Sequence, residues 1–182
     1  MIASTYVSPS TIRTRVLAQT FCSSCGSFSE SEDSLLVLPV HLSDSVQDAV
    51  DHYTADESLP EYICLICKKT GAHLEKNFIA LPDVLVVQLK RFQFVNGKSR
   101  KLDKPVSCDL ALTIRTQSSS SPVSHNYKLM SVVHHTGNLS TGHYTTTVIN
   151  DGGKMYLCND QAVDPCRRVD FKSAYILFYV RT

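Results

Sequence analysis

Two Cys-x-x-Cys pairs constrain the fold of this chain more than any other feature. The first pair is Cys22 and Cys25, followed directly by Gly26, and the second is Cys64 and Cys67. Each pair follows a run that is typical of a β-strand, so the four thiolates can meet at the corners of a tetrahedron. A glycine after the second thiol suits a tight knuckle, because the backbone turns there with positive φ. The spacing predicts a structural Zn2+ site, and the alternative is four reduced thiols without a metal.

His73 follows the second cysteine pair closely. A fifth metal ligand is one interpretation of this residue. Four thiolates already complete a structural zinc site, so we expect His73 to be a solvent-exposed loop residue.

Composition points to a globular protein of the cell interior. The chain is 43% hydrophobic and 19% charged, and its net charge of +1 gives no overall attraction to nucleic acid or anionic lipid. No run approaches the roughly 20 apolar residues that cross a bilayer, and the first residues do not resemble a signal peptide. The seven cysteines suit reduced thiols and a metal better than a disulfide framework. We expect an intracellular location, in the cytoplasm or nucleus, and neither a nucleic-acid nor a membrane partner.

The first half of the chain mixes strands, loops and one short helix. Residues 1–15 are expected to form a flexible lead-in, and residues 16–21 a strand. Residues 27–33 are polar and acidic, which predicts a loop, and residues 35–40 are apolar enough for another strand. Ser45 and Asp48 have the form of a capping box, which predicts a short amphipathic helix.

From Phe78 onwards the pattern favours β-structure. The apolar run at residues 84–89 predicts a central strand that is buried on both faces. Asn96-Gly97 is a strong hairpin signal, and Lys90 and Arg91 bring charge to the strand end before it. Residues 117–122 are rich in serine and predict an exposed loop.

His143 is the first candidate for chemistry. An apolar run through residues 131–135 crosses a Gly/Asn/Ser turn and re-enters a β-branched run at His143, so this histidine is expected at a strand start. The next strand-like run ends in Asn159 and Asp160, and either side chain can hold an imidazole in one tautomer. The alternative is an ordinary surface histidine in a hairpin.

Longer motifs carry a family resemblance. The segment from Tyr127 to Gly137 and the triplet Gly142-His143-Tyr144 closely resemble the histidine box of the ubiquitin-specific proteases, which are papain-like cysteine deubiquitinases. The segment at residues 81–92 is similar to the palm signature of that family. The segment at residues 173–179 is similar to its closing strand.

This resemblance implies an α+β fold of the papain-like cysteine protease class, with a mainly antiparallel β palm and a zinc-ribbon fingers subdomain. The fingers would comprise residues 16–77 and the palm residues 78–182, with the thumb subdomain absent and residues 1–15 as its possible remnant. The fingers would grip ubiquitin or a ubiquitinated protein, and the zinc ligands would be the four cysteines of the two pairs, Cys22, Cys25, Cys64 and Cys67.

The resemblance also assigns roles around the histidine. His143 would be the general base and Asn159 the residue that orients it, with Asp160 as the second choice or as a partner that polarises water and the oxyanion. Gly142 and Tyr144 would line the narrow channel for the Gly-Gly tail of ubiquitin. His134 and His135 are expected to be strand and loop residues, not bases.

The nucleophile is the missing part. The family's Gly-Asn-Thr-Cys box does not occur in this sequence. Cys108 is expected within a strand, Cys158 beside Asn159 in a strand, and Cys166 in a loop, none with the helix start that activates a catalytic thiol. Three hypotheses follow: the fingers-and-palm part of a deubiquitinase whose thiol lies in a separate thumb segment, a catalytically inactive ubiquitin-binding scaffold, or a zinc-ribbon interaction module with a β-sandwich-like partner.

Overall fold

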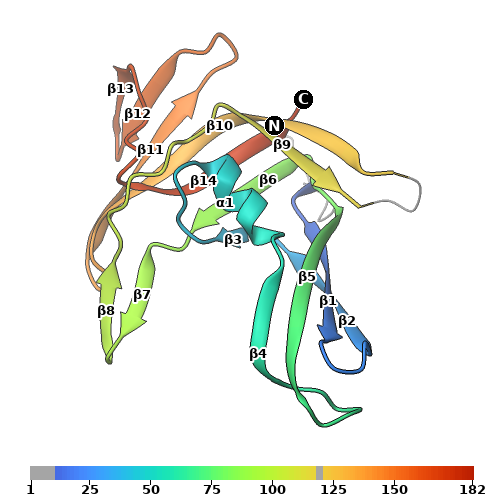
Figure 1. The fold of residues 1–182 in the computed structure, drawn as a ribbon. Coiled ribbons are helices and arrows are strands. Elements are labelled where there is room, and N and C mark those ends of the chain that lie inside the picture. Colours follow the sequence, from blue (N-terminus) through green and yellow to red (C-terminus); the bar gives the residue numbers. More distant parts are fainter. Residues whose placement is uncertain (1–10, 118–120) are drawn as a thin grey trace, which may run out of the picture.

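The computed structural model describes residues 11–117 and 121–182 as a mostly antiparallel β structure (Figure 1). In these two ranges one α-helix is present, α1 (Val46–Tyr53). No helix of the described residues has the length and apolar character needed to cross a membrane. The predicted lead-in and the predicted serine-rich loop lie partly outside the described residues, at residues 1–10 and 118–120.

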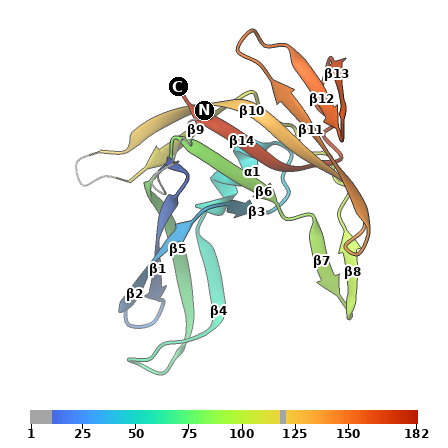
Figure 2. The ribbon, with the colours of Figure 1, turned by 180° about the vertical axis from the view of Figure 1, so that it is seen from behind.

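A four-stranded antiparallel sheet carries both cysteine pairs at its far end (Figures 1 and 2). Hydrogen bonds join its strands in the order β2 (Phe28–Leu35), β1 (Thr14–Cys22), β5 (Thr70–Ala80) and β4 (Glu57–Ile63). β1 ends at Cys22 and β4 ends one residue before Cys64. The strand ends therefore bring the two pairs together, as predicted.

The prediction of a loop at residues 27–33 is wrong, because residues 28–33 form most of β2. β2 pairs with β1 without a register shift, from Phe21 opposite Phe28 to Thr14 opposite Leu35. Seven of the eight residues of β2 are exposed, so the strand has no apolar alternation that the sequence could reveal. Pairing with β1 holds it in place instead, together with exposed ion pairs such as that between Arg15 and Glu32.

An eight-stranded sheet forms the rest of the β structure. Its strands follow the order β13 (Ala162–Cys166), β12 (Met155–Asn159), β11 (Gly142–Ile149), β10 (Val123–Gly137), β14 (Ala174–Arg181), β6 (Val84–Leu89) and β3 (Leu38–Val40), and β9 (Ala111–Thr116) also pairs with β10. β3 and β6 are parallel, and the other pairs are antiparallel. β9 and β11 pair with successive segments of the same long strand, so β10 connects two distant parts of the sheet.

β6 is buried on one face only, which corrects the prediction of two buried faces. Leu85, Val87 and Leu89 are fully buried, whereas Val84, Val86 and Gln88 on the other face are partly exposed.

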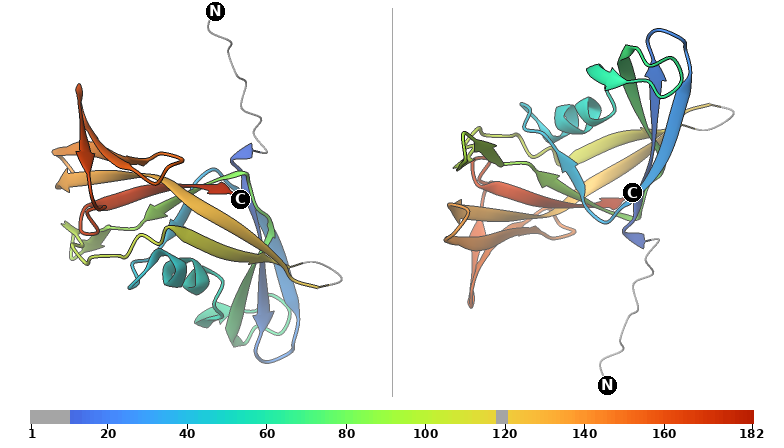
Figure 3. Two further views of the ribbon diagram at one scale, coloured as in Figure 1. Left: turned by 90° about the horizontal axis from the view of Figure 1, so that it is seen from above. Right: turned by 90° about the horizontal axis from the view of Figure 1, so that it is seen from below.

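The helix prediction is confirmed. The Ser45 hydroxyl accepts a hydrogen bond from the backbone N–H of Asp48 at 3.1 Å, as a capping residue does, and Val46, Ala49 and Val50 are buried. Figure 3 places α1 and the four-stranded sheet on one side of the eight-stranded sheet, whose β12–β13 end bends toward the opposite side. α1 and β3 lie within residues 16–77 but pack with the larger sheet, so the division at residue 77 remains a prediction.

The hairpin of β7 (Phe92–Val95) and β8 (Lys98–Lys101) confirms the predicted turn at Asn96-Gly97. Asn96 and Gly97 have φ values of 51° and 73°, as a two-residue turn of this kind requires. The hairpin and the four-stranded sheet extend in the same direction from the larger sheet (Figures 1 and 2).

Arg91, which the sequence placed as a charge at a strand end, is fully buried. Its guanidinium donates hydrogen bonds to the carbonyl oxygens of Ala174, Leu102, Lys104 and Phe171. Burial lowers the pKa of this side chain from its usual value. The four bonds connect residues 102–104, which follow β8, with Phe171 and with the first residue of β14. Arg91 therefore fixes where the β7–β8 hairpin leaves the sheet.

Candidate functional site

His143 lies at the second residue of β11, as the sequence predicts for a strand start. It pairs with Thr136 on β10, at the end of a hairpin. Its Nε2–H donates to Oδ1 of Asn159 at 2.6 Å. This bond leaves Nδ1 as the ring nitrogen with a lone pair, which is the form that a proton acceptor needs.

Asn159 and Asp160 lie at the end of β12, but only the first contacts the histidine through a hydrogen bond. Asn159 is the last residue of β12, and Asp160 is the first residue of the turn into β13. Asp160 has a φ of 51°, a left-handed conformation that Asp tolerates better than most residues. Among the described hydrogen bonds, none joins Asp160 to His143. The geometry therefore favours Asn159 over Asp160 for the orienting role, which remains a prediction for both.

The loop before His143 is held by Asn138. Its Oδ1 accepts from the backbone N–H groups of Ser140 at 2.8 Å and Thr141 at 2.9 Å. Gly137 has a φ of +117°, and a Cβ there would lie 2.4 Å from the carbonyl oxygen of Thr141. Only glycine fits this position, so a larger residue at 137 would force the loop before His143 out of this conformation.

Gly142 is required by its neighbour His135. A Cβ on Gly142 would lie 2.1 Å from Nε2 of His135 and 2.8 Å from the carbonyl oxygen of Thr136. Tyr144 is 57% exposed, and its ring centroid lies 4.7 Å from that of His135. The family resemblance implies that Gly142 and Tyr144 line a substrate channel, which remains a prediction. The structure adds a local reason for the glycine.

His135 is the main residue of the site that sequence reasoning undervalued. It is 3% exposed, and its ring packs with Phe92 at 5.7 Å and with Tyr175 at 6.0 Å between centroids. Burial, reinforced by the nearby charge of Lys101, lowers the pKa of His135. This ring packs against Gly142 and Tyr144. His135 lies in β10, as the expected strand position requires, and its exclusion as a base remains a prediction.

His134 belongs to a separate buried chain of hydrogen bonds. Its Nδ1 lies 3.1 Å from the Ser173 hydroxyl, which donates to Asp170, and its Nε2 lies 2.8 Å from the Thr147 hydroxyl. Burial lowers the pKa of His134. Both ring nitrogens are engaged, so this histidine joins β10, β11 and the start of β14 and has no free nitrogen for catalysis.

The four cysteines of the two pairs lie together and could bind a metal. Their sulfur atoms all lie within 4.8 Å of one another, and the Cys22–Cys67 and Cys25–Cys64 sulfur distances are 3.6 and 3.8 Å. Four bonds of about 2.3 Å to a tetrahedral zinc place sulfurs about 3.8 Å apart. The donor set and its spacing thus fit zinc.

Both cysteine pairs form the same kind of knuckle. Gly26 N–H donates to the carbonyl of Cys22 at 3.0 Å, and Lys68 N–H donates to that of Cys64 at 2.9 Å. Gly26 and Lys68 have φ values of 69° and 60°, so the position after the second thiol has positive φ in each pair. The sequence predicted this at Gly26, whereas in the second pair a lysine adopts it.

Ser27 lies within the cluster of thiols. Its hydroxyl is 3.0 Å from the sulfur of Cys25 and 3.3 Å from that of Cys64. Hydrogen bonding from Ser27 lowers the pKa of Cys25, and that of Cys64 to about 6. Thiolate, the form that binds metal, is therefore favoured at these two sulfurs.

His73 is outside the group of metal-ligating atoms. Its ring stacks on Phe21 with a centroid distance of 5.1 Å, and its Nε2 lies 3.6 Å from the Glu75 carboxylate. It is exposed, as predicted, but it belongs to β5 and not to a loop.

The remaining three cysteines are poorly placed to act with His143. Cys108 is buried outside any strand, contrary to the prediction, and burial raises its pKa to about 12. Cys158 precedes Asn159 in β12, and successive side chains of a strand point to opposite faces. Cys166 belongs to β13, not to a loop, and pairs with Met155 at the far end of β12 from Asn159.

Comparisons with known proteins give the family context. A family model described as "Ubiquitin carboxyl-terminal hydrolase" matches residues 7–179. The chain is 31% identical over 176 residues to ubiquitin carboxyl-terminal hydrolase 25 of Arabidopsis thaliana, covering 91% of this chain and 26% of the relative. It is 31% identical over 163 residues to ubiquitin hydrolase B of Dictyostelium discoideum, covering 82% of this chain and 36% of the relative. Among the curated relatives compared, this chain spans between 14% and 38% of their length.

Solved structures agree with this assignment. The yeast SAGA DUB module with a mutant Sgf73 matches with a TM-score of 0.84 and 28% identity, over 95% of this chain and 41% of that chain. The SAGA Ubp8/Sgf11/Sus1/Sgf73 DUB module bound to ubiquitin aldehyde matches with a TM-score of 0.82 and 27% identity, over 95% of this chain and 42% of that chain. The predicted fold class, an antiparallel β palm with a four-cysteine ribbon, is confirmed. With the family model matching nearly its whole length, this chain belongs to the ubiquitin carboxyl-terminal hydrolase family.

Proposed function

We propose that this chain is the fingers-and-palm part of a cysteine-type deubiquitinase that hydrolyses the isopeptide bond after the terminal glycine of ubiquitin. The observation that carries the proposal is the hydrogen bond from Nε2 of His143 to Oδ1 of Asn159. It fixes the imidazole in the tautomer whose Nδ1 can accept a proton. A thiol protease needs this arrangement on the side opposite its cysteine.

In the proposed reaction, Nδ1 of His143 takes the proton of a cysteine thiol, and the thiolate attacks the carbonyl carbon of the terminal glycine. The imidazolium then returns that proton to the leaving lysine amine, which leaves a thioester. Water attacks the thioester with His143 again as the base, and the thiol and the free ubiquitin carboxylate are regenerated. Asn159 holds the ring in position through both steps.

The thiol in this proposal belongs to a thumb segment outside this sequence. The support is the placement of the other three cysteines. Cys108 is buried, Cys158 faces the side of β12 opposite to Asn159, and Cys166 pairs with Met155 at the other end of β12. The alternative is a catalytically inactive protein that binds ubiquitin. The same cysteine placement favours that alternative for the chain alone.

Ubiquitin contact would follow the surfaces that surround His143. Gly142 and Tyr144 would line the path of the ubiquitin tail, with His135 supporting both from below. Zinc held by Cys22, Cys25, Cys64 and Cys67 would supply no chemistry to the reaction, because four protein ligands close its coordination sphere. Its role would be to hold the end of the four-stranded sheet against the globular body of ubiquitin.

Two measurements test the proposal. Titration of the 15N-labelled chain with ubiquitin is expected to shift the resonances of Gly142, Tyr144 and their neighbours, and Tyr144→Ala is expected to weaken the binding. Val163→Ala is the matched control, because Val163 is an exposed apolar residue on β13 with 62% exposure. Absence of binding would overturn both hypotheses, the deubiquitinase part and the inactive ubiquitin-binding protein.

A ubiquitin that carries a C-terminal vinyl sulfone tests whether the nucleophilic thiol lies in this chain or in another segment. We expect no adduct with this chain alone. An adduct on Cys108, Cys158 or Cys166 would show that the nucleophile lies in this sequence. Side-chain 15N spectra give a further check, since Asn159→Ala should convert His143 from a single Nε2–H tautomer to a mixture.

A further inference from the structure

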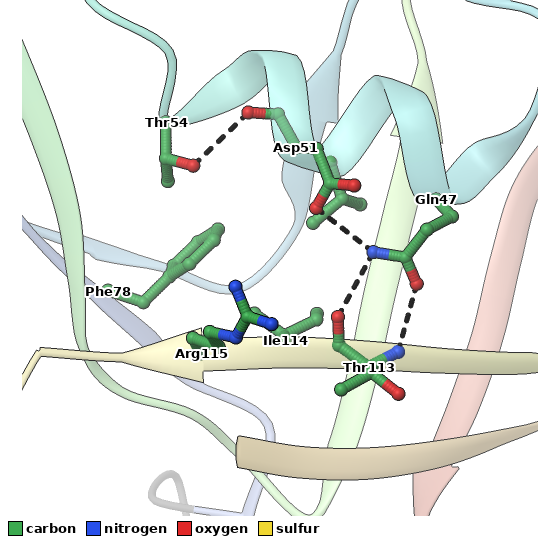
Figure 4. A pocket seen from close by; sticks show the side chains of 8 residues that line it. Gln47, Asp51, Thr54, Phe78, Thr113, Ile114 and Arg115 are labelled. Atoms are coloured by element: carbon green, nitrogen blue, oxygen red, sulfur yellow. Dashed lines mark hydrogen bonds between the residues drawn. The ribbon is translucent and has the colours of Figure 1, made fainter. Parts of the chain in front are cut away.

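The four-stranded sheet is anchored at its base to α1 and to the larger sheet. The carbonyl oxygen of Phe78 on β5 accepts from the backbone N–H of Gln117 at 2.9 Å, and the Phe78 ring stacks on Tyr53 of α1 at 5.8 Å between centroids. Close by, the side-chain amide of Gln47 joins α1 to the backbone of Thr113 on β9 through two bonds of 2.9 and 3.0 Å (Figure 4). The base of the sheet therefore has polar and aromatic tethers that do not depend on a metal.

At the opposite end of this sheet the apolar side chains face outward. Ile63, Leu65 and Ile66 of the second knuckle are 59%, 75% and 76% exposed, so they do not form a core there. One backbone hydrogen bond, from Ser23 N–H to the carbonyl of Gly71 at 3.1 Å, connects the first knuckle with the turn after the second. The cluster of thiols and the groups that contact it must therefore contribute most of what holds the two knuckles together.

Ser27 lies where the first knuckle leads into β2. Its carbonyl oxygen accepts from the backbone N–H of Cys22 at 2.8 Å. The next residue, Phe28, pairs with Phe21 at the end of β1. The backbone of Ser27 is thus held on both sides by its own sheet, and its partly buried side chain is directed into the cluster.

The Ser27 hydroxyl lies between sulfurs of the two different knuckles. Its oxygen is 3.0 Å from the sulfur of Cys25, which belongs to the first knuckle, and 3.3 Å from that of Cys64, which belongs to the second. A hydroxyl carries one proton, so it donates to one of these sulfurs at a time, and both are within reach. This side chain can therefore link the two knuckles in addition to any metal.

A hydroxyl at this place has a clear chemical use. A divalent zinc ion neutralises only half of the charge of four thiolates, so hydrogen-bond donors aimed at the sulfurs stabilise the charge that is left. The backbone N–H of Ser24 does this for Cys22 at a distance of 3.4 Å. Groups that hydrogen-bond to metal ligands also orient them, and their removal typically lowers metal affinity by about 10–100-fold.

We propose that Ser27 is a positioning residue for zinc, whose hydroxyl donates to the thiolates of Cys25 and Cys64 and so raises the zinc affinity of the four-cysteine site. The inference rests on the zinc site included in the proposed function, but it requires no nucleophile for His143. It also gives β2 a second attachment. Seven of the eight residues of β2 are exposed, and Ser27 connects the start of this strand directly to the metal ligands.

The first test is the zinc affinity of the full chain, measured by competition with a chromophoric chelator. Ser27→Ala is expected to bind zinc about 10-fold more weakly, whereas Ser27→Thr keeps the hydroxyl and should bind like the unmodified chain. Ser29→Ala is the matched control, because Ser29 is an exposed serine of β2 that pairs with Thr20. Equal affinities of Ser27→Ala and the unmodified chain would overturn the proposal, and so would an equal loss in Ser27→Ala and Ser27→Thr.

The second test replaces zinc with Co2+ and records the sulfur-to-cobalt charge-transfer band in the near ultraviolet. A hydrogen bond lowers the energy of the sulfur lone pair, so the band should move to longer wavelength in Ser27→Ala and stay in place in Ser27→Thr and Ser29→Ala. An unmoved band in Ser27→Ala would show that the hydroxyl does not donate to the ligands. If the unmodified chain bound neither metal, the zinc site and this inference would fail together. Loss of ubiquitin binding with normal zinc affinity would count against the proposed function alone.

Discussion

Removal of one of the four thiols that could bind zinc gives a sharp test of how the four-stranded sheet is held together. In Cys64→Ser the sulfur that lies 3.8 Å from that of Cys25 is replaced by a hydroxyl, a much weaker ligand for zinc. We expect the variant to lose zinc and the end of this sheet to unfold. The eight-stranded sheet should remain folded, because it has its own buried core.

The expected size of the effect follows from the burial of side chains. Apart from the cysteines, the buried apolar residues in the strands of the smaller sheet are Val16, Ala72 and Phe78, and Val16 and Phe78 belong to the common core at the base. Burial of one such valine or phenylalanine contributes about 1.5–3 kcal/mol. A structural zinc contributes about 10–16 kcal/mol in small domains. Near the knuckles the metal therefore outweighs the apolar contribution several-fold.

Hydrogen exchange followed by mass spectrometry is the suitable assay, combined with metal analysis. Peptides that cover residues 20–30 and 62–74 should lose protection in Cys64→Ser, whereas peptides from β10 and β14 should keep it. Cys158→Ser is the matched control, since Cys158 is a partly buried thiol outside the cluster. Full protection of the knuckle peptides in the zinc-free variant would refute the claim that the metal holds this end of the sheet.

Three further outcomes are expected. Gly142→Ala should lower the free energy of unfolding by about 1–3 kcal/mol in urea denaturation, because its Cβ would overlap His135, and a smaller loss would mean that the ring moves freely. Arg91→Met should cost about 3 kcal/mol or more by the same measurement, since four carbonyls lose their donor. The pKa of His134 is lower in the folded protein than in the unfolded chain. As the pH is lowered, the unfolded chain therefore takes up the proton at a higher pH than the folded protein does. Stability should therefore be full above about pH 6.5 and fall as the pH decreases below it, by up to about 1.4 kcal/mol per unit, and His134→Gln should reduce this slope.

Local patterns in the sequence were sufficient to predict the two strand ends that carry His143 and Asn159. The Gly/Asn/Ser turn before His143 and the strand that ends at Asn159 were both recognisable, and the structure joins their side chains at 2.6 Å. The glycine after Cys25 likewise indicated a knuckle. In each case the residues that determine the backbone conformation lie within a few positions of the functional group, so short-range rules apply.

Features that depend on distant partners could not be predicted in this way. β2 has almost no buried residue, and only its pairing with β1 makes it a strand. Arg91 follows an apolar strand like a charge at a surface, yet its hydrogen-bond acceptors come from segments as far along the chain as Ala174. His135 carries no local sign that its ring will face Gly142 across a hairpin.

Strand pairing also explains how His143 and Asn159 can be held together without a cysteine in contact with them. His143, Asn159 and the supporting ring of His135 lie on β11, β12 and β10, which are consecutive neighbours in one sheet. Their arrangement is fixed by strand pairing, by the glycines of the hairpin and by aromatic packing, all within the described residues. A thiol brought to Nδ1 of His143 would therefore find a base already oriented. Under the proposed function, this chain would supply a preorganised base and its orienting amide, and the reaction would require a sulfur from another segment.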